Sequence, residues 1–215
     1  KKASDIKLDS IIKQGKKYKI LIIKDRKKLC FYSSSNFESH IKNLLASLTV
    51  ISIFKDIKKL EKNIFYNHKL PKGRGDISKI KINKKNIYLI DESYNSNPLS
   101  LKSAILNYDK IFSNNKKRYL LLGDMLELGK HSKKLHQSIS PLINKSKIDK
   151  VFVKGNNALS LFKKLSKSKK GGILHNKSQI VELIKNKLNN NDYLMIKASN
   201  ATGFNRIVQE LKGLN

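Results

Sequence analysis

The stretch NIYLIDESYNSNP, residues 86–98, decides the fold class of this 215-residue chain. Its first six residues predict a strand, because apolar side chains run up to the acid Asp91. Asn97 suits the N-cap of a helix, Pro98 suits its first turn, and apolar residues follow at helical spacing as far as Phe112. A strand that leads through a polar loop into a helix is the repeating element of α/β folds.

The same alternation of strand and helix continues towards the C-terminus. We expect strands at residues 118–122, 150–153, 172–174 and 193–197. Apolar stripes predict a helix after each of them, at residues 131–143, 158–165, 180–188 and 204–211, and Pro141 should end or kink the first of these. Five strands, each followed by a helix, imply right-handed crossovers, so the predicted fold is α/β with a doubly wound, mostly parallel, Rossmann-like sheet.

The N-terminal third shows a different order of elements. Strands are predicted at residues 18–24 and 29–32, followed by helices at 37–54 and 56–65. We expect the first helix to be buried, because it is apolar on nearly all sides after Leu44. The segment 66–76 contains one Pro and two Gly and predicts an irregular connection, so we place a domain boundary after it and expect domains at 1–76 and 77–215.

The composition is strongly basic, with a formal net charge of +30. Only four of the 46 basic residues are arginine, the side chain that bidentate phosphate grips and base readout favour, so we interpret the lysines as a solvated coat. Cys30 is the single cysteine, which excludes an internal disulfide framework and a cysteine-based zinc site. No apolar run approaches the roughly 18 residues of a membrane span, and we expect a cytoplasmic protein.

Ligands of open α/β sheets bind beyond the carboxyl ends of the strands, so the loops after the strands are the candidate site. The first loop follows Asp91 and contains Tyr94 and Asn95, whose polar groups suit a ribose, a cation or an anion at a helix N-terminus. The second loop, residues 123–129, carries two acids between two glycines. The third begins at Lys197, an ammonium that suits a carboxylate or phosphate, and continues with small residues that allow a ligand to approach closely.

These three loops, in this order, resemble those of the Mur ligases of peptidoglycan synthesis, above all the members that add D-alanyl-D-alanine to the UDP-N-acetylmuramoyl-tripeptide. Residues 91–98, DESYNSNP, are similar to that group's D-D-S-Y-N-A-N-P, and residues 123–129, GDMLELG, match its G-D-M-x-E-L-G. Residues 197–200, KASN, resemble its K-G-S-R, with Asn200 in the place of the arginine. Gly73 and Arg74 stand where the family has a G-R before its C-terminal domain.

The resemblance also implies which residues meet each substrate. The helix that contains His40 and Asn43 resembles the family's central-domain H-N-x-x-N-x-x-A-A, although these two residues are three apart where the family has four. The residues implied on the ATP side are Asn43, Arg74, Asp91, Tyr94 and Asn95, with His40 as a further candidate. The residues implied on the dipeptide side are Lys197, Ser199 and Asn200, with Asp124 and Glu127 behind them. No catalytic residue and no metal ligand is identified.

Family membership would imply an ATP-dependent ligase that activates a substrate carboxylate as an acyl phosphate, with Mg²⁺ offsetting the phosphate charge. Its substrates would be the UDP-muramoyl tripeptide and D-alanyl-D-alanine, and we expect a monomer without a nucleic-acid partner. The sequence contains no G-x-x-x-x-G-K-[ST] loop that could cradle ATP phosphates. We therefore expect the C-terminal part of a longer ligase, comprising the end of its central ATPase domain and its C-terminal domain. We expect this part to be inactive alone, and ATP and Mg²⁺ to be bound mainly by the upstream part.

Three alternatives remain open at this point. A sister ligase with another amino substrate would share the fold but should carry different loops at these places. A lysine-rich α/β module that binds RNA would explain the charge directly, and it predicts basic residues clustered on one face with aromatics between them. A free-standing binding domain with no catalytic partner is the third.

Overall fold

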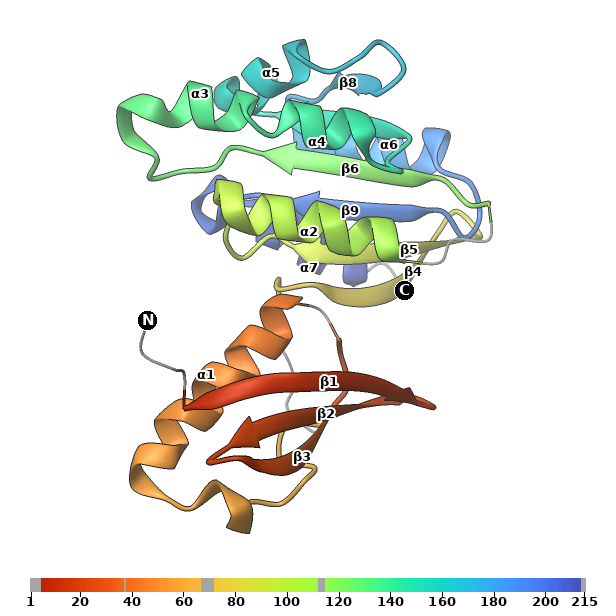
Figure 1. Ribbon diagram of the computed structural model, residues 1–215. Coiled ribbons are helices and arrows are strands. Elements are labelled where there is room, and N and C mark those ends of the chain that lie inside the picture. The colour runs from red at the N-terminus through yellow and green to blue at the C-terminus, as the bar shows by residue number, and fades with distance from the viewer. Residues whose placement is uncertain (1–4, 37, 67–71, 112–114, 214–215) are drawn as a thin grey trace. The chain divides into compact units, whose positions relative to one another are not determined.

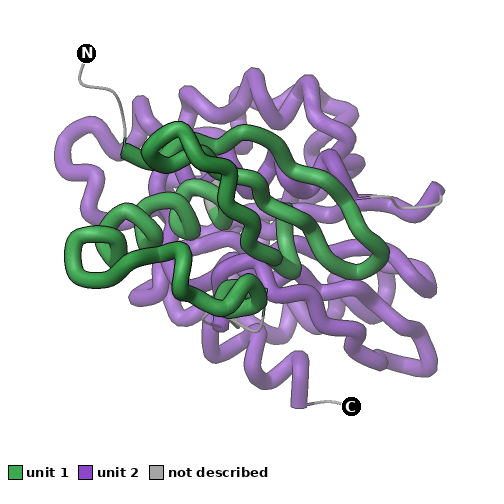
Figure 2. Tube along the Cα trace, turned by 60° about the horizontal axis from the view of Figure 1, so that its bottom comes forward, with its two compact units in different colours: residues 1–69 green, residues 70–215 purple. Residues whose placement is uncertain are grey.

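The computed structural model describes residues 5–36, 38–66, 72–111 and 115–213. The chain divides into two compact units, Lys1–Lys69 and Leu70–Asn215, which Figure 2 distinguishes by colour. Each unit has its own apolar core, so each is described by itself.

Unit 1 is a three-stranded antiparallel sheet with one long helix. The sheet has the order β1-β2-β3, from β1 (Ile6–Gln14), β2 (Lys17–Lys24) and β3 (Lys27–Ser33). Alternate residues of β2 and β3 pack against one stripe of α1 (Glu38–Phe54), and this contact forms the core of the unit. Figure 1 shows α1 lying across one face of this sheet.

Two strands of unit 1 confirm the predictions, and two predictions about its helices are wrong. Among the apolar residues of α1 the buried ones form a single stripe, Ile41, Leu44 and Leu48. Ile53 and Phe54 are 74% and 78% exposed, so burial could not be predicted from apolar composition alone. The predicted helix 56–65 is only a 3₁₀ turn at Ile57–Lys59. The chain leaves helical geometry there because it bonds to the sheet instead, through the Lys62 carbonyl, which accepts from the Tyr32 N–H at 2.8 Å. Strand β1 was not predicted.

Unit 2 is built on a six-stranded sheet of order β4-β5-β9-β6-β7-β8, which confirms the predicted α/β class (Figure 1). The five parallel strands are β5 (Lys85–Glu92), β6 (Arg118–Gly123), β7 (Lys150–Lys154), β8 (Lys170–Ile173) and β9 (Tyr193–Lys197). The sixth strand, β4 (Asp76–Ile82), is an antiparallel edge strand that the sequence analysis missed. It joins β5 through a tight turn at Asn83 and Lys84, both at positive φ.

Helices cover both faces of this sheet, as a doubly wound fold requires. One core lies under α2 (Pro98–Lys110), α4 (Ser140–Lys145) and α5 (Asn156–Lys163), with α3 (Ser132–Gln137) beside α5. The other lies under α6 (Lys177–Lys187) and α7 (Phe204–Lys212). The predicted helix 131–143 is divided into α3 and α4, and the break precedes Pro141, because proline fits the first turn of α4.

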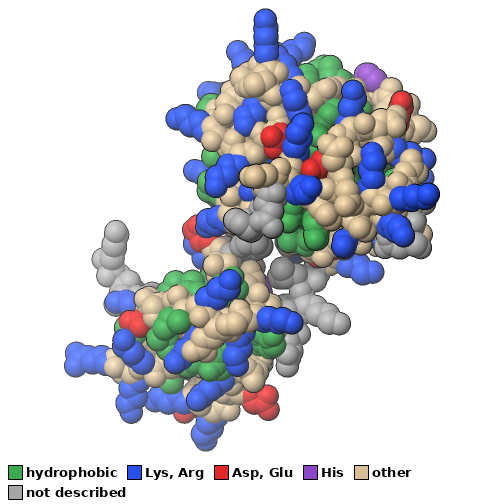
Figure 3. All heavy atoms as spheres, turned by 90° about the vertical axis from the view of Figure 1, so that its right-hand side faces the viewer, with side chains coloured by type: hydrophobic (Ala, Val, Ile, Leu, Met, Phe, Trp, Pro, Cys, Tyr) green, Lys and Arg blue, Asp and Glu red, His purple; other side chains and the backbone are tan. Residues whose placement is uncertain are grey.

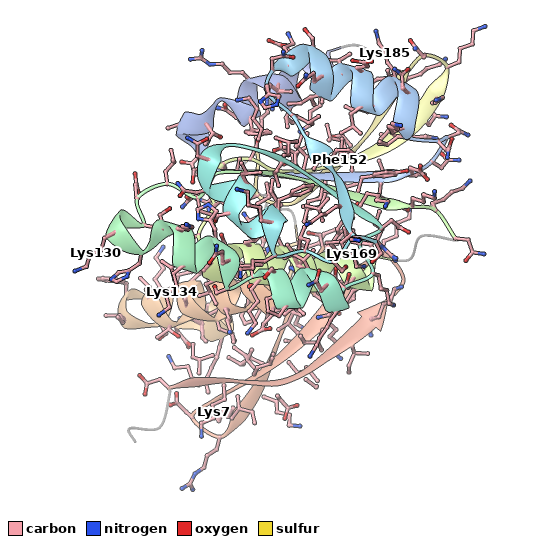
Figure 4. The ribbon with its side chains drawn as sticks, turned by 90° about the horizontal axis from the view of Figure 1, so that it is seen from above. Lys7, Lys130, Lys134, Phe152, Lys169 and Lys185 are labelled. Carbon is pink, nitrogen blue, oxygen red and sulfur yellow. The ribbon has the colours of Figure 1, made fainter. Side chains whose placement is uncertain are left out.

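The lysines of unit 2 lie mainly at its surface. Figure 4 shows Lys130 and Lys134 at the periphery of the η2 (Gly129–His131) and α3 segment, whereas Phe152 lies among the side chains of the core. Among the described residues, no helix combines the length and apolar character that a membrane crossing requires.

The strand order brings the three candidate loops together. Strand β9 lies between β5 and β6, with Lys197 in register with Glu92 on one side and with Leu122 on the other. All three strands run in the same direction, so the loops that follow them leave the sheet at one edge. The sheet therefore places these loops side by side although they are far apart in sequence.

Candidate functional site

Ser199 joins the three loops through hydrogen bonds. Its side chain is buried, its hydroxyl accepts from the Leu126 N–H at 2.9 Å, and the same hydroxyl donates to the Ser96 carbonyl at 3.2 Å. Its own N–H donates to the Asp124 carbonyl at 3.2 Å. Leu126 and Asp124 belong to the loop after β6, and Ser96 belongs to the loop after β5. A single serine at the end of β9 thus ties both neighbouring loops to its own.

Lys197 is a buried cation at the end of β9. It is 1% exposed, and its ammonium donates to the Asn95 carbonyl at 2.8 Å and to Glu92 Oε2 at 3.3 Å. Burial lowers the pKa of Lys197 and raises the pKa of Glu92, while the attraction between the two opposes both shifts. Each charge therefore depends on the other to remain ionised in this environment. Glu92, which the sequence analysis did not select, is the partner that makes the buried lysine tolerable.

Arg74 lies on the ring of Tyr94. Its guanidinium carbon is 4.5 Å from the ring centroid, a cation–π geometry, and both side chains are exposed. Gly73 permits this arrangement because it has a φ of +79°, and a Cβ added there would lie 2.9 Å from the Tyr94 nitrogen. Among the described residues no hydrogen bond engages the guanidinium, so its donors can meet an anion at the same edge of the sheet as Lys197.

Asp91 is buried, and its carboxylate bonds to other residues of unit 2. Its Oδ1 accepts from the Ser93 N–H at 3.1 Å and from the Ser93 hydroxyl at 2.6 Å. Its Oδ2 is 3.1 Å from the Lys212 ammonium, which also contacts Asp76 Oδ2 at 2.6 Å. Both carboxylate oxygens of Asp91 thus bond to other residues of unit 2. Asp91 therefore supports the loop beside the predicted nucleotide side from within the protein.

Asp124 caps a helix. Its Oδ1 accepts from the Ala158 N–H at 2.7 Å, in the first turn of α5, where the N-cap residue Gly155 has no side chain to do so. Gly155 is required for this approach, because it has a φ of +122° and a Cβ added there would overlap the Asp124 carboxylate. Glu127 and Asn200 are exposed, and Glu127 has a positive φ of 62°.

His136 is a buried residue that supports the loop after β6 through hydrogen bonds. It is 1% exposed, its Nε2 is 2.9 Å from the Met125 nitrogen, and its Nδ1 is 2.8 Å from the Ser132 carbonyl. Because the Met125 N–H must donate to Nε2, the imidazole is neutral with its proton on Nδ1. The position of His136 four residues after Ser132 in a helix was the only signal of this role, and it is a weak one.

The predicted site residues fall into two groups. His40 is buried and Asn43 is exposed, and both lie on α1 of unit 1. The others lie in unit 2, at or beside the edge where β5, β6 and β9 end. Among the described residues, no group of three or more His, Cys, Asp or Glu side chains is placed to hold a metal ion. The described residues therefore offer no such group of ligands for the Mg²⁺ that the resemblance implies.

The loop cluster is suited to binding. It presents exposed polar groups on Tyr94, Asn95, Asn200 and Glu127, together with the Arg74 cation, over a frame in which Ser199 and Lys197 are buried and hydrogen-bonded. The arrangement can therefore hold and orient polar, anionic molecules at the carboxyl edge of the sheet.

Comparisons with known proteins agree with this geometry. The family model described as "Mur ligase, glutamate ligase domain" matches residues 78–200. The UDP-N-acetylmuramoyl-tripeptide–D-alanyl-D-alanine ligase of Bacillus subtilis is 32% identical over 126 residues, covering 57% of this chain and 27% of that protein. The enzyme of the same name from Buchnera aphidicola subsp. Baizongia pistaciae is 33% identical over 178 residues, covering 80% of this chain and 36% of that protein.

The fold matches solved structures over nearly its full length. The MurF ligase of Thermotoga maritima, solved in complex with ADP, has a TM-score of 0.77 at 18% identity and covers 99% of this chain and 47% of that one. The chain thus spans about a quarter to a third of the curated relatives named above and about half of this structural neighbour.

Ser199→Ala tests the junction of the loops. The substitution leaves the Leu126 N–H and the Ser96 carbonyl without their partner, and we expect a loss of about 1–3 kcal/mol in the free energy of unfolding by urea. Ser138→Ala is the matched control, because that exposed hydroxyl bonds only to the Leu135 carbonyl of its own helix. Equal stability of the two variants would show that Ser199 does not join the loops.

Lys197→Met tests the buried pair. The attraction of Lys197 lowers the pKa of Glu92, so its removal should raise the pKa of Glu92 further above its usual value. The measurement is a titration of the Glu92 side-chain carboxyl by NMR, with Lys154→Met at the end of β7, which β6 separates from β9, as the control. A Glu92 pKa that is the same in the wild type and in Lys197→Met would contradict the pairing.

Proposed function

The chain belongs to the Mur ligase family, and we propose that it is the C-terminal part of an ATP-dependent ligase that adds D-alanyl-D-alanine to UDP-N-acetylmuramoyl-tripeptide in peptidoglycan precursor synthesis. The observation that carries the proposal is the loop cluster. The three segments that resemble this type of ligase in sequence, residues 91–98, 123–129 and 197–200, are tied together by Ser199 at one edge of the sheet. The relatives from Bacillus subtilis and Buchnera aphidicola carry the name of this enzyme.

We assign residues 1–76 to the end of the central ATP-binding domain and residues 77–215 to the C-terminal domain. The sequence has no phosphate-binding loop, and the described residues offer no metal site. The loop that holds the ATP phosphates and the ligands of Mg²⁺ therefore belong, in this proposal, to the rest of a longer protein. The 215-residue chain alone should form no amide bond.

The nucleotide side of the proposed site consists of Arg74, Tyr94 and Asn95. The guanidinium of Arg74, held on the ring of Tyr94, is a fixed cation with planar donors that suit a phosphate oxygen. Asp91 supports this side from behind, because both of its carboxylate oxygens are engaged within the protein. His40 and Asn43 of unit 1 are proposed to contact the nucleotide from the central domain.

The dipeptide side consists of Lys197, Asn200 and Glu127. Lys197 is buried, and its bonds to the Asn95 carbonyl and to Glu92 hold the first loop beside the proposed dipeptide position. Asn200 adds an exposed amide next to it, and Glu127 can attract the amino group of the dipeptide. Ser199 and Asp124 hold the loops that present these groups.

This arrangement orients reactants rather than transferring protons. In the proposed reaction the tripeptide carboxylate takes the γ-phosphoryl group of ATP and ADP leaves. The dipeptide amine then attacks the acyl carbon, the bond to the phosphate oxygen breaks, phosphate leaves and the nitrogen loses a proton as the amide forms. The residues of this chain bring the amine to the acyl group and keep water away, which is the usual contribution of a closing domain. We propose that the protein acts as a monomer in the cytoplasm.

The distribution of charge favours this function over RNA binding. Figure 3 shows Lys and Arg scattered over the visible face of each unit rather than gathered in one patch. The stacked aromatic pair Tyr88 and Tyr193 lies on neighbouring strands of the sheet rather than in a basic groove. This pattern supports a solvated coat of lysines.

Arg74→Ala in the full-length protein tests the proposal. Loss of one charge-assisted contact to phosphate costs about 1.5–3 kcal/mol, so the KM for ATP should rise about 10- to 100-fold, with the KM for D-alanyl-D-alanine unchanged. The assay measures phosphate release and the UDP-muramoyl pentapeptide product together. Lys79→Ala is the matched control, because it removes an exposed cation that lies 6.0 Å from the ring of Tyr88, outside the loops.

Two outcomes would contradict the proposal. Absence of product from the wild-type full-length protein with these substrates would overturn the assigned reaction. An unchanged KM for ATP in Arg74→Ala would overturn the assigned role of Arg74.

A further inference from the structure

Two carboxylates face each other at the start of the C-terminal sheet. Asp76 of β4 and Asp91 of β5 are direct partners in the antiparallel register, a placement in which like charges destabilise the strand pair. The Lys212 ammonium, in the last turn of α7, contacts both, at 2.6 Å to Asp76 Oδ2 and at 3.1 Å to Asp91 Oδ2. One cation at the end of the described chain thus permits the pairing of these two acids.

The same two acids hold the turn that carries Arg74. Asp76 Oδ1 accepts from the Gly73 N–H at 2.8 Å, and the Asp91 carbonyl accepts from the Gly75 N–H at 2.7 Å. The Gly73 carbonyl in turn accepts from the Tyr94 N–H at 3.1 Å. The backbone is therefore bonded on both sides of Arg74, and one of these bonds reaches the residue whose ring the guanidinium covers.

The Lys212 ammonium keeps its positive charge beside the two carboxylates. Burial lowers the pKa of Lys212, but the hydrogen bonds and charges of Asp76 and Asp91 outweigh burial and raise it above its usual value. Lys212 therefore stays protonated throughout the neutral range, and its contribution to stability is lost only when the pH rises through this raised pKa. The other charged groups at this place are Glu92, whose Oε1 lies beside Gly75, and Arg74 itself.

We propose that Lys212 is a positioning residue for Arg74: its ion pairs with Asp76 and Asp91 fix the turn 73–76 on unit 2 and so hold the guanidinium over Tyr94. The role of Arg74 towards the nucleotide rests on the proposed function, whereas the fixing of the turn does not. Lys212 needs no contact with substrate for this role. It acts through two carboxylates, one of which accepts from the Gly73 N–H, and through two backbone–backbone hydrogen bonds.

Hydrogen exchange in the full-length protein tests the fixing of the turn. Peptides that cover residues 72–76 and 93–96 should exchange at least about tenfold faster in Lys212→Met than in the wild type, since the two facing carboxylates are then left without their cation. Peptides from β6 and β7 should be unchanged, and Lys212→Arg should restore slow exchange. Lys187→Met, an exposed lysine in the last turn of α6, is the control.

Kinetics test the consequence for Arg74. Lys212→Met should raise the KM for ATP with kcat and the KM for the dipeptide within about twofold of wild type, and Lys212→Arg should restore it. The double variant Arg74→Ala, Lys212→Met should be no worse than Arg74→Ala alone, because the two residues act through one group. An equal rise of the KM for ATP and of the KM for the dipeptide in Lys212→Met would overturn the positioning role. So would additive rises of the KM for ATP in the double variant.

The hydrogen-exchange and kinetic experiments together distinguish a failure of this inference from a failure of the proposed function. If exchange at residues 72–76 is unchanged in Lys212→Met, the fixing of the turn is wrong whatever the kinetics show. If exchange is faster but Arg74→Ala leaves the KM for ATP unchanged, the fixing of the turn stands and the nucleotide role of Arg74 is wrong.

Discussion

The candidate site depends on the position of β9 between β5 and β6 and on the hydroxyl of Ser199 at its end. Parallel strands that end at one edge leave their loops next to each other, but neighbouring loops remain in place only where polar groups bind them together. Ser199 does this with a donor and an acceptor on one atom, because its hydroxyl bonds to the loop of β5 and to the loop of β6. The exposed residues of the site are presented by loops that this side chain connects.

The buried charges of the site are likewise held by specific polar partners. Lys197 and Glu92 form one pair, and Lys212 serves Asp76 and Asp91 together. A buried ion pair contributes little net stability, because desolvation offsets much of the attraction, but removal of one partner leaves an uncompensated charge at a high cost. These pairs therefore specify where the loops lie more than they stabilise the fold.

The sequence predicted the strands of the parallel sheet and the edge at which the site lies, because buried parallel strands are continuous apolar runs and capped helices follow them. It did not predict β4, since an edge strand that alternates Lys and Ile buries only one side and resembles a surface segment. Burial of α1 was overestimated, because its apolar residues after Leu44 exceed what a three-stranded sheet can cover. Ser199 and Asp124 were predicted as residues of the dipeptide side, which stays a prediction; their hydrogen bonds within the protein emerged only from the structure, because a sequence gives a side chain and not its partner.

The central claim is that the three loops form one cooperative unit. Native-state hydrogen exchange in increasing urea, followed for the amides of Ser93, Met125, Leu126 and Ser199, tests it most directly, since these four N–H groups lie in the three loops and donate to Asp91, His136, Ser199 and Asp124. The account predicts a single free energy of opening with the same dependence on urea for all four amides. Separate and low opening free energies for the amides of different loops would contradict it.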